Sequence, residues 1–395
     1  MKKGWLMKFS LLSISLVLTS AGAISGNIPA MAKTFANEPL SSVEMLTTIP
    51  ALMVVIFVLL SSFIAKKIGS KQTVILGLVI ALVSGLVPVF STNFTLILIS
   101  RAGLGVGFGL FNSLAVSMIS DFYDGDTRAQ LIGFQSAFQG LGTAIMTYVA
   151  GQLLKTNWHI TFWIYAIILP ILVLFILFVP SPEKEGLHAT TSDVAAKPVK
   201  QSTNLQVIGY VLFLFAVLVI YMAAQVKLAL LLTTNGYGSA TDASNIISLM
   251  SVGGMLAGFS FGAIFKLVRQ YTIPFSLVLM ALGFCCLTIA NSVVLAGIGS
   301  VLVGVAFSLF VPYLFNQVSI VSPAGSATLS TSLLLVGSNL GSSMSPYGLA
   351  LLSKLSGTTA VNGIFMVGGI LLAIMAVVGF CFVLSRRNKH ILKEG

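Results

Sequence analysis

The feature that most constrains this chain is a series of long apolar runs. Twelve segments of mostly apolar residues follow one another, separated by short polar turns or turns that contain Gly or Pro. They lie near residues 9–31, 44–65, 73–91, 94–120, 130–153, 159–180, 206–233, 245–267, 273–290, 293–320, 326–353 and 361–385. A helix needs about 20 apolar residues to cross a bilayer, whereas a barrel strand needs about 10. Backbone groups that face lipid must be paired within their own segment, so the pattern predicts twelve transmembrane helices.

The composition excludes a soluble fold. Of the 395 residues, 57% are hydrophobic and only 8% are charged, and the mean hydropathy is +1.03. A soluble domain carries about 25% charged residues, so the apolar surface must face lipid. Cys285, Cys286 and Cys381 lie in apolar runs without metal-ligand spacing, which is typical of core residues. We therefore expect no metal and no cofactor. The net charge of +11 would suggest a nucleic-acid partner in a soluble protein, but we expect none for a chain that lies in lipid.

The first apolar run resembles a secretory signal peptide, because Lys2 and Lys3 precede it and small residues end it near Ala32. A signal peptide has an apolar core of about 7–15 residues. The run here is longer, and eleven further runs follow it. We interpret it as a retained first helix.

The distribution of basic residues predicts the orientation. If the N-terminus is cytoplasmic, sixteen Lys and Arg residues fall on the cytoplasmic side and only Lys33, Lys155 and Lys354 fall on the other. Arg101 and Lys227 are left within the membrane. The positive-inside rule therefore predicts that both termini lie in the cytoplasm. We expect a multi-pass protein of the cell membrane that acts as a monomer.

The longest polar segment, 181–205, divides the chain into two halves, 1–180 and 206–395, with six apolar runs each. It is rich in Glu, Lys, Ser, Thr and Pro, which is typical of a flexible linker. With six runs before it, this linker is expected in the cytoplasm. The sequence thus predicts two six-helix bundles.

The two halves share sequence at an offset of 199 residues. The segments 105–111 (GVGFGLF) and 304–310 (GVAFSLF) agree at five of seven positions. The same offset pairs Leu141-Gly142 with Leu340-Gly341, Tyr148 with Tyr347, and Lys67 with Lys266. The pattern indicates duplication, and so predicts an all-α polytopic membrane protein whose bundles are related by a pseudo-two-fold axis along the membrane normal. In such transporters the binding site lies between the repeats, near the midplane.

Two motifs carry a resemblance to a known family. The turn between spans two and three reads Ser62-Phe63-Ile64-Ala65-Lys66-Lys67-Ile68-Gly69-Ser70-Lys71, and span four contains Arg101-Ala102-Gly103-Leu104-Gly105-Val106-Gly107. With the twelve spans and the central linker, they resemble the major facilitator superfamily, whose loop motif is Gly-x-Leu-Ala-Asp-Arg-x-Gly-Arg-Lys. Ala65, Gly69 and Lys71 match, Lys67 keeps the positive charge, and Lys66 replaces the aspartate that helps latch the two halves.

The span-four motif is similar to that of the drug/proton antiporters with twelve spans, although the Gly-Pro of their span-five signature is absent. The resemblance implies a secondary transporter that moves a small molecule by alternating access, with export as the favoured direction and protons as a candidate coupling ion. The alternative is an uptake or exchange carrier for a small organic anion or neutral metabolite. We do not expect an enzyme, because the spans offer no nucleophile beside a base.

The resemblance also implies candidate substrate-binding residues, because spans one, four, seven and ten line the cavity in this family. The polar residues on these spans are Asn27, Asn112, Tyr221, Gln225, Tyr313, Asn316 and Gln317. Gln135 and Gln139, four residues apart, share one face of span five. Each of these side chains could bind substrate, or could tie helices together.

Ionisable groups at membrane depth are candidates for function. For Arg101 we weigh a coupling element or an anion clamp against a structural arginine that binds carbonyls at a helix break. For Lys227 we weigh a substrate-binding role against a side chain that reaches the interface on its long stem. The predicted spans leave all ten acidic residues in loops, tails or helix ends, with Glu44 the nearest substitute for a deep carboxylate. This favours neutral or anionic substrates over cationic ones.

The acids of the turn between spans four and five suggest a replacement for the missing latch. Asp121 or Asp126 is expected to pair with Lys66 or Lys67 at the cytoplasmic face, since these turns share that side of the membrane.

Overall fold

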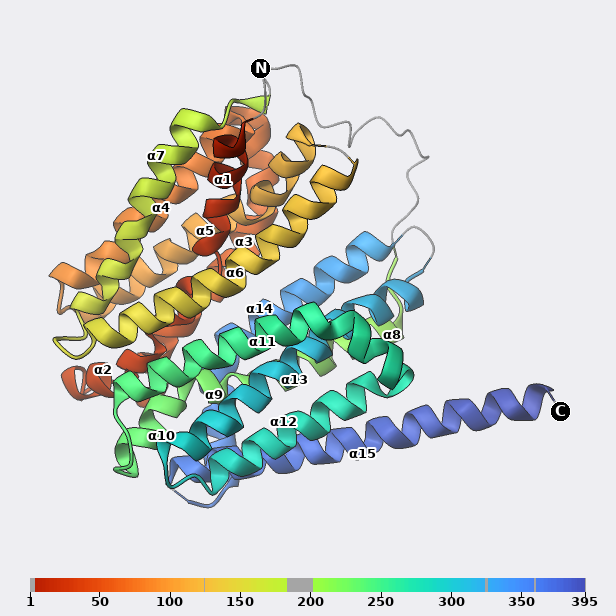
Figure 1. Cartoon of the computed structure of the whole chain (residues 1–395). Coiled ribbons are helices and arrows are strands. Elements are labelled where there is room, and N and C mark those ends of the chain that lie inside the picture. Colours follow the sequence, from red (N-terminus) through yellow and green to blue (C-terminus); the bar gives the residue numbers. More distant parts are fainter. Residues whose placement is uncertain (1–3, 124, 183–201, 324–325, 359, 395) are drawn as a thin grey trace. The chain divides into compact units, whose positions relative to one another are not determined.

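The computed structural model describes residues 4–123, 125–182, 202–323, 326–358 and 360–394. Over this part of the chain the regular secondary structure is helical, and each of the twelve predicted runs coincides with a helical segment (Figure 1). Most of the predicted linker, residues 183–201, lies outside the described residues. The prediction of an all-α polytopic fold is confirmed.

The chain forms two compact units. The first comprises Met1–Lys200 together with Asn339–Pro346, and the second Gln201–Ser338 together with Tyr347–Gly395. A short stretch of the eleventh run is thus grouped with the first unit. The halves 1–180 and 206–395 remain a prediction from the sequence.

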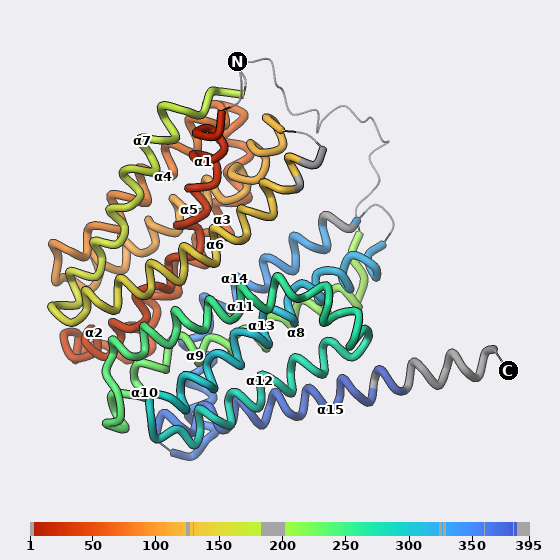
Figure 2. Tube along the Cα trace, viewed as in Figure 1, coloured from red at the N-terminus to blue at the C-terminus, as the bar shows by residue number. Residues whose placement is uncertain are grey.

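The first unit begins with a broken helix and continues with long rods, which Figure 2 shows in red to yellow-green. The broken helix consists of α1 (Trp5–Ser13), η1 (Ile14–Leu16), η2 (Ser20–Asn27) and α2 (Ile28–Thr34). The rods are α3 (Leu40–Ile68), α4 (Ser70–Phe90), α5 (Phe94–Phe122), α6 (Gly125–Leu153) and the pair η3 (Ile160–Ile167) with α7 (Ile168–Phe178).

The second unit repeats this order. Its broken helix consists of α8 (Leu205–Tyr221), α9 (Ala223–Val226) and α10 (Leu228–Thr234). It is followed by α11 (Ala240–Val268), η5 (Arg269–Tyr271), α12 (Thr272–Thr288), α13 (Val293–Val321), α14 (Ala327–Leu355) and α15 (Val361–Glu394).

Glycines let equivalent helices pack closely in the two units. A Cβ at Gly105 of α5 would collide with the backbone of Pro50 in α3, and a Cβ at Gly304 of α13 would collide with the backbone of Met250 in α11. Gly105 and Gly304 are the pair related by the offset of 199 residues. The glycines of spans four and ten therefore act as packing surfaces, and the same helix contact recurs in both halves.

By length and apolar composition, eight helices in the described part of the chain can cross a membrane, or nine if the bent pair Trp5–Leu16 and Ser20–Thr34 counts as one span. One of the eight, Ala240–Thr288, has 49 residues and contains the turn at η5. A rise of 1.5 Å per residue makes it about 70 Å long, enough for two crossings of a core of roughly 30 Å. The helix α6, which is rich in Gly and Gln, and the helix α14, which is rich in Ser, are not among them, so the count of twelve spans remains a prediction.

The turns at the start of α4 and α12 require unusual backbone angles. Gly69, which the family motif also carries, has φ +93°. At the corresponding turn of the second unit Arg269 has φ +48° and ψ −121°. A side chain with a Cβ is strained at such angles, whereas glycine is not.

We expect Arg269→Gly to raise the midpoint of thermal unfolding, because a non-glycine residue in this region of backbone space costs about 1–3 kcal/mol. Thermal unfolding of the purified protein in detergent, followed by circular dichroism, measures the shift. Arg269→Ala is the control, since it removes the same charge but keeps the Cβ. Equal shifts for the two variants would show that the side chain, and not the backbone, is responsible.

Candidate functional site

The first apolar run is interrupted near its middle by two segments of 3-10 helix, η1 and η2. The hydroxyls of Ser13, Ser20 and Ser25 each donate to the carbonyl three residues earlier, at 2.7–2.9 Å. Such local bonds compete with the regular α-helical pattern. The break leaves backbone carbonyls that other elements must satisfy.

Arg101 of α5 supplies several of the missing partners. Its Nη2 donates to the carbonyl of Ala21 in η2 at 2.6 Å, and its Nη1 donates to the hydroxyl of Tyr165 in η3 at 2.9 Å. Its Nε donates to the carbonyl of Leu46 in α3 at 2.8 Å. In a regular helix that carbonyl would accept from residue 50, but Pro50 has no N–H. The arginine thus satisfies carbonyls that a helix break and a proline leave open.

Aromatic rings complete the surroundings of the guanidinium. The rings of Phe162 and Tyr165 lie 5.8 and 5.5 Å from its central carbon. The Tyr165 hydroxyl also donates to the carbonyl of Ser20 at 3.2 Å. Arg101 is fully buried. These contacts fit a structural arginine that binds carbonyls at a helix break, one of the roles considered for Arg101. The side chain joins α3, η2 and η3.

Asn27 is held in the same manner at the end of η2. Its amide nitrogen donates to the hydroxyl of Thr161 at 2.5 Å and to the carbonyl of Trp158 at 3.2 Å. The Trp158 indole in turn donates to the Thr34 hydroxyl at 3.1 Å. The predicted substrate residue Asn27 therefore ties span one to the start of span six.

The backbone of span five, which carries the two predicted glutamines, packs against the break of span one. Thr19 donates to the carbonyl of Gln139 at 3.2 Å, and a Cβ at Gly142 would collide with the carbonyl of Leu16. Gln135 is buried, and its amide nitrogen has no hydrogen-bond partner among the described residues. Asn112 is half-buried on α5. The structure thus brings Gln139 to the break, while Gln135 keeps an unused donor.

In the second unit the predicted residues of span seven gather at its breaks. Gln225 of α9 donates to the hydroxyl of Tyr221 at 3.1 Å, and the Tyr221 ring stacks on Phe307 of α13 with 3.8 Å between the ring centres. Lys227, between α9 and α10, is 5% exposed. The lysine is thus buried, whereas a side chain that reaches the interface would be exposed.

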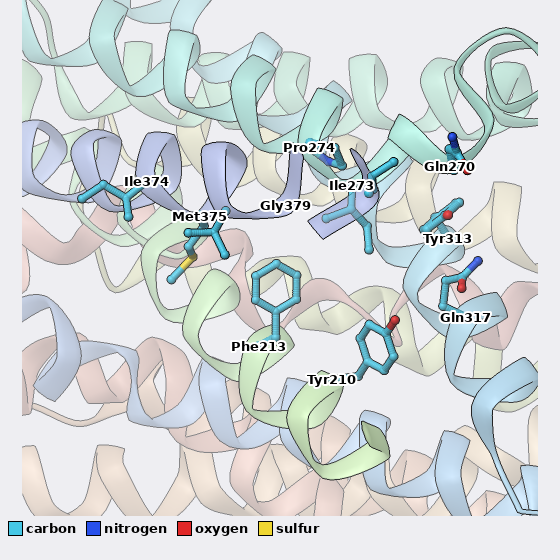
Figure 3. A pocket seen from close by; sticks show the side chains of 12 residues that line it. Tyr210, Phe213, Gln270, Ile273, Pro274, Tyr313, Gln317, Ile374, Met375 and Gly379 are labelled. Atoms are coloured by element: carbon cyan, nitrogen blue, oxygen red, sulfur yellow. The ribbon is translucent and has the colours of Figure 1, made fainter. Parts of the chain in front are cut away.

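The three candidate substrate-binding residues of span ten do not lie together. Tyr313 and Gln317 line a cavity of about 570 Å³ inside the second unit (Figure 3), whereas Asn316 is exposed on another side of α13. Tyr210 of α8 and Gln270 of η5 line the same cavity. Tyr210 and Gln270 were not predicted from the sequence, because neither residue belongs to a motif or to the middle of a span.

The motif of the loop between spans two and three has mainly local contacts. Gly69 forms the turn, and its N–H donates to the carbonyl of Ala65 at 2.8 Å. The Lys71 ammonium donates to the carbonyl of Ile176 near the end of α7 at 2.9 Å. Lys66 and Lys67 are exposed.

On the acidic side of the predicted latch, Asp121 is half-buried. The side chain of Asp126 lies outside the described residues. The latch therefore stays a prediction.

One expectation about acidic residues is wrong. Glu44 was expected at the outer start of a helix, but α3 begins four residues earlier and Glu44 has no exposed surface. Of the acidic side chains that the structure describes, Glu44 is the fully buried one. In the same part of the chain no group of His, Cys, Asp and Glu could hold a metal ion.

The profile of the Major Facilitator Superfamily matches residues 10–346. The chain belongs to this superfamily. As a major facilitator protein it is a multi-pass membrane transporter and not an enzyme.

Similar proteins share parts of the chain. "Multidrug transporter protein MdtP" of Bacillus subtilis is 26% identical over 174 residues, which cover 44% of this chain and 30% of that protein. "Multidrug efflux protein YfmO" of the same organism is 28% identical over 167 residues, 41% of this chain and 42% of that protein. This chain thus matches less than half the length of either relative.

Solved transporters share the fold over nearly the whole chain. The D-xylose–proton symporter matches with a TM-score of 0.74 and 16% identity, over 95% of this chain and 97% of that one. A variant of the nucleoside transporter NupG matches with a TM-score of 0.75 and 13% identity, over 96% and 99%. At this identity the likeness establishes the fold alone.

For this major facilitator protein we expect Arg101→Lys to lower stability although the charge is kept, because one ammonium cannot reach Leu46, Ala21 and Tyr165 together. Hydrogen bonds to charged groups contribute about 1.5–3 kcal/mol each, so the loss should reach at least about 2 kcal/mol. Tyr165→Phe should cost less. The measurement is thermal unfolding in detergent, with the exposed Arg128→Lys as control. An unchanged midpoint for Arg101→Lys would contradict the structural role.

Proposed function

We propose that this transporter exports a small amphipathic molecule by alternating access, in exchange for protons that Glu44 carries. The observation on which this rests is the complete burial of Glu44, which has no exposed surface. Ionisable residues within membrane spans are costly and mark proton relays and ion pathways. A buried carboxyl can exchange its proton only when a conformational change opens it to water.

The position of Glu44 supports coupling to the broken helix. Glu44 lies two residues before Leu46, whose carbonyl Arg101 binds, and Arg101 also binds Ala21 at the break of span one. The Thr47 hydroxyl donates to the backbone carbonyl of Glu44 at 2.8 Å. Protonation of Glu44 therefore acts on the turn of α3 that is bonded, through Arg101, to the break of span one.

The side chains at the breaks favour a neutral or weakly charged aromatic substrate. The stacked rings of Tyr221 and Phe307 offer an aromatic surface, and Gln225 adds hydrogen-bonding groups beside them. The names of the multidrug relatives support export of such compounds. We place both termini in the cytoplasm because the basic residues are distributed one-sidedly, and we take the monomer as the transporting form because one chain carries all twelve predicted spans.

The Glu44→Gln variant tests the proton role. In everted membrane vesicles, we expect uptake of the dye Hoechst 33342 driven by a pH gradient to fall to the level of vesicles without the transporter. Exchange of labelled against unlabelled dye at equal pH should persist, because the amide keeps the size of the side chain but cannot carry a proton. Glu38→Gln, which changes an exposed carboxyl ahead of the same helix, is the control.

Two results would contradict the proposal. Gradient-driven uptake by Glu44→Gln equal to that of the unchanged protein would exclude Glu44 as the proton carrier. Loss of exchange as well as gradient-driven uptake would show that Glu44 serves the structure or the substrate site instead.

Lys227 favours a second candidate function. Its side chain is 5% exposed at the junction of α9 and α10, and a buried ammonium is a potential partner for a carboxylate or phosphate group. With Lys227 as the anion site, the protein would take up or exchange a small organic anion.

The Lys227→Gln variant discriminates between the two functions. If the protein is an anion carrier, uptake of a panel of radiolabelled carboxylates into proteoliposomes should be lost in this variant, and in Arg101→Ala as well if the guanidinium contributes. Export of the dye should survive Lys227→Gln if the first proposal is right. Anion uptake that survives both changes would eliminate the anion carrier.

A further inference from the structure

The cavity of the second unit is uncharged but has two chemically different ends. It lies between α8, η5, α12, α13 and α15, and it has a volume of about 570 Å³. Tyr313, Gln317 and Gln270 lie at one end, toward which the Tyr210 side chain points (Figure 3). Phe213 and Met375 lie at the other end with aliphatic side chains (Figure 3). The cavity is thus apolar over most of its length and carries hydroxyl and amide groups at one end.

The first unit shows that this cavity is not a necessary consequence of the fold. At the offset of 199 residues, Tyr313 and Gln317 correspond to Leu114 and Met118 of α5, and both of these side chains are buried. There α1 packs against α7, and Lys71 bonds the start of α4 to the carbonyl of Ile176 in α7. The duplicated fold can therefore fill this space with apolar side chains, and the second half carries polar groups there instead.

The cavity is separate from the break of span seven. Tyr210 and Tyr221 lie on the same helix, α8, and the residues between them put roughly 16 Å of helix between their positions. Neither Gln225 nor Lys227 is among the residues that line the cavity. All of its lining residues belong to the second unit.

We propose that this cavity binds a neutral, aromatic molecule of drug size with one hydrogen-bonding end. Cavities of about 300–1,000 Å³ with mostly apolar walls and a few polar groups are typical of small-molecule sites. The three aromatic side chains offer faces for stacking. The uncharged lining excludes an ion, which would lose its hydration without a partner.

A lipid acyl chain fits the lining less well, because it offers no acceptor to the Tyr210 hydroxyl and no hydrogen-bonding group to the amides of Gln270 and Gln317. The proposal concerns binding and does not depend on the direction of transport or on Glu44. It adds a binding site within one unit to the function proposed above.

Photolabelling with benzophenone tests the proposal. This probe is neutral and aromatic, has one carbonyl acceptor, and on irradiation inserts preferentially into methionine C–H bonds, so that Met375 acts as the reporter. In nanodiscs we expect labelling of Met375, quantified by peptide mass spectrometry, to saturate with probe concentration. Met366, on the same helix, lines a separate apolar cavity of about 500 Å³ and is the internal reference for labelling at a site without a polar end.

A matched pair of glycine variants ties the labelling to the cavity. A Cβ at Gly379 makes ordinary contact with Pro274 at 3.6 Å, so Gly379→Leu places its side chain in the cavity and should reduce Met375 labelling several-fold. Gly209→Leu makes the same change where nothing lies within 4 Å and should leave it unchanged. Absent or non-saturating labelling of Met375, or labelling that Gly379→Leu does not reduce, would overturn the proposal; non-saturating labelling is the result expected if lipid chains occupy the cavity.

Competition between two tricyclic compounds tests the polar end. Fluorenone and fluorene share one planar ring system, and only fluorenone carries a carbonyl. One neutral hydrogen bond changes an affinity by about 2- to 12-fold, so fluorenone should displace benzophenone at correspondingly lower concentration. In Tyr210→Phe this difference should shrink if the Tyr210 hydroxyl is the donor. Equal competition by both compounds in the unchanged protein would refute a hydrogen-bonding end.

Discussion

The structure depends on one constraint, which is that every backbone carbonyl at membrane depth needs a hydrogen-bond donor. A continuous helix meets this need by itself, but span one is broken and α3 contains Pro50. Arg101 resolves both defects, with donors to Leu46 in α3 and to Ala21 in η2. A break at this depth requires such a side chain, because lipid offers no donors. The arginine is thus a condition for the irregular first span.

The two units solve the same problem differently. At the offset of 199 residues Arg101 corresponds to Ser300 of α13, which is also fully buried but has no fork of donors. The breaks of span seven are short, and the N–H of Lys227 still donates to Ala223 while that of Leu231 donates to Lys227. The backbone on either side of Lys227 is thus paired within span seven itself, and the Gln225 side chain donates to Tyr221. The first unit thus contains the cross-links of Arg101, and the second contains the polar cavity.

Much of this fold could be predicted from the sequence, because apolar run length and the offset between the halves are properties of the chain alone. The structural alternative for Arg101 also followed from residue type and depth. The burial of Glu44 could not be predicted, because it depends on where α3 begins and on which neighbours cover its first turns. Tyr210 and Gln270 were missed for a similar reason. They line a cavity only because α8, η5 and α13 converge there, and such convergence leaves no mark at a single position.

The cross-links of the first unit restrict how it can move. Moving span one away from α5 and η3 would break the bond of Arg101 to Ala21, that of Tyr165 to Ser20 and those of Asn27 to Trp158 and Thr161. Each buried donor or acceptor left unpaired would cost about 1–3 kcal/mol, and a charged group would cost more. Rigid-body motion of the first unit keeps all of these bonds. Internal rearrangement is cheaper in α8–α10, where Lys227 begins a new helix within a few residues of Tyr221. The residue that we propose as the proton carrier and the side chains that we propose to face the substrate therefore belong to different units.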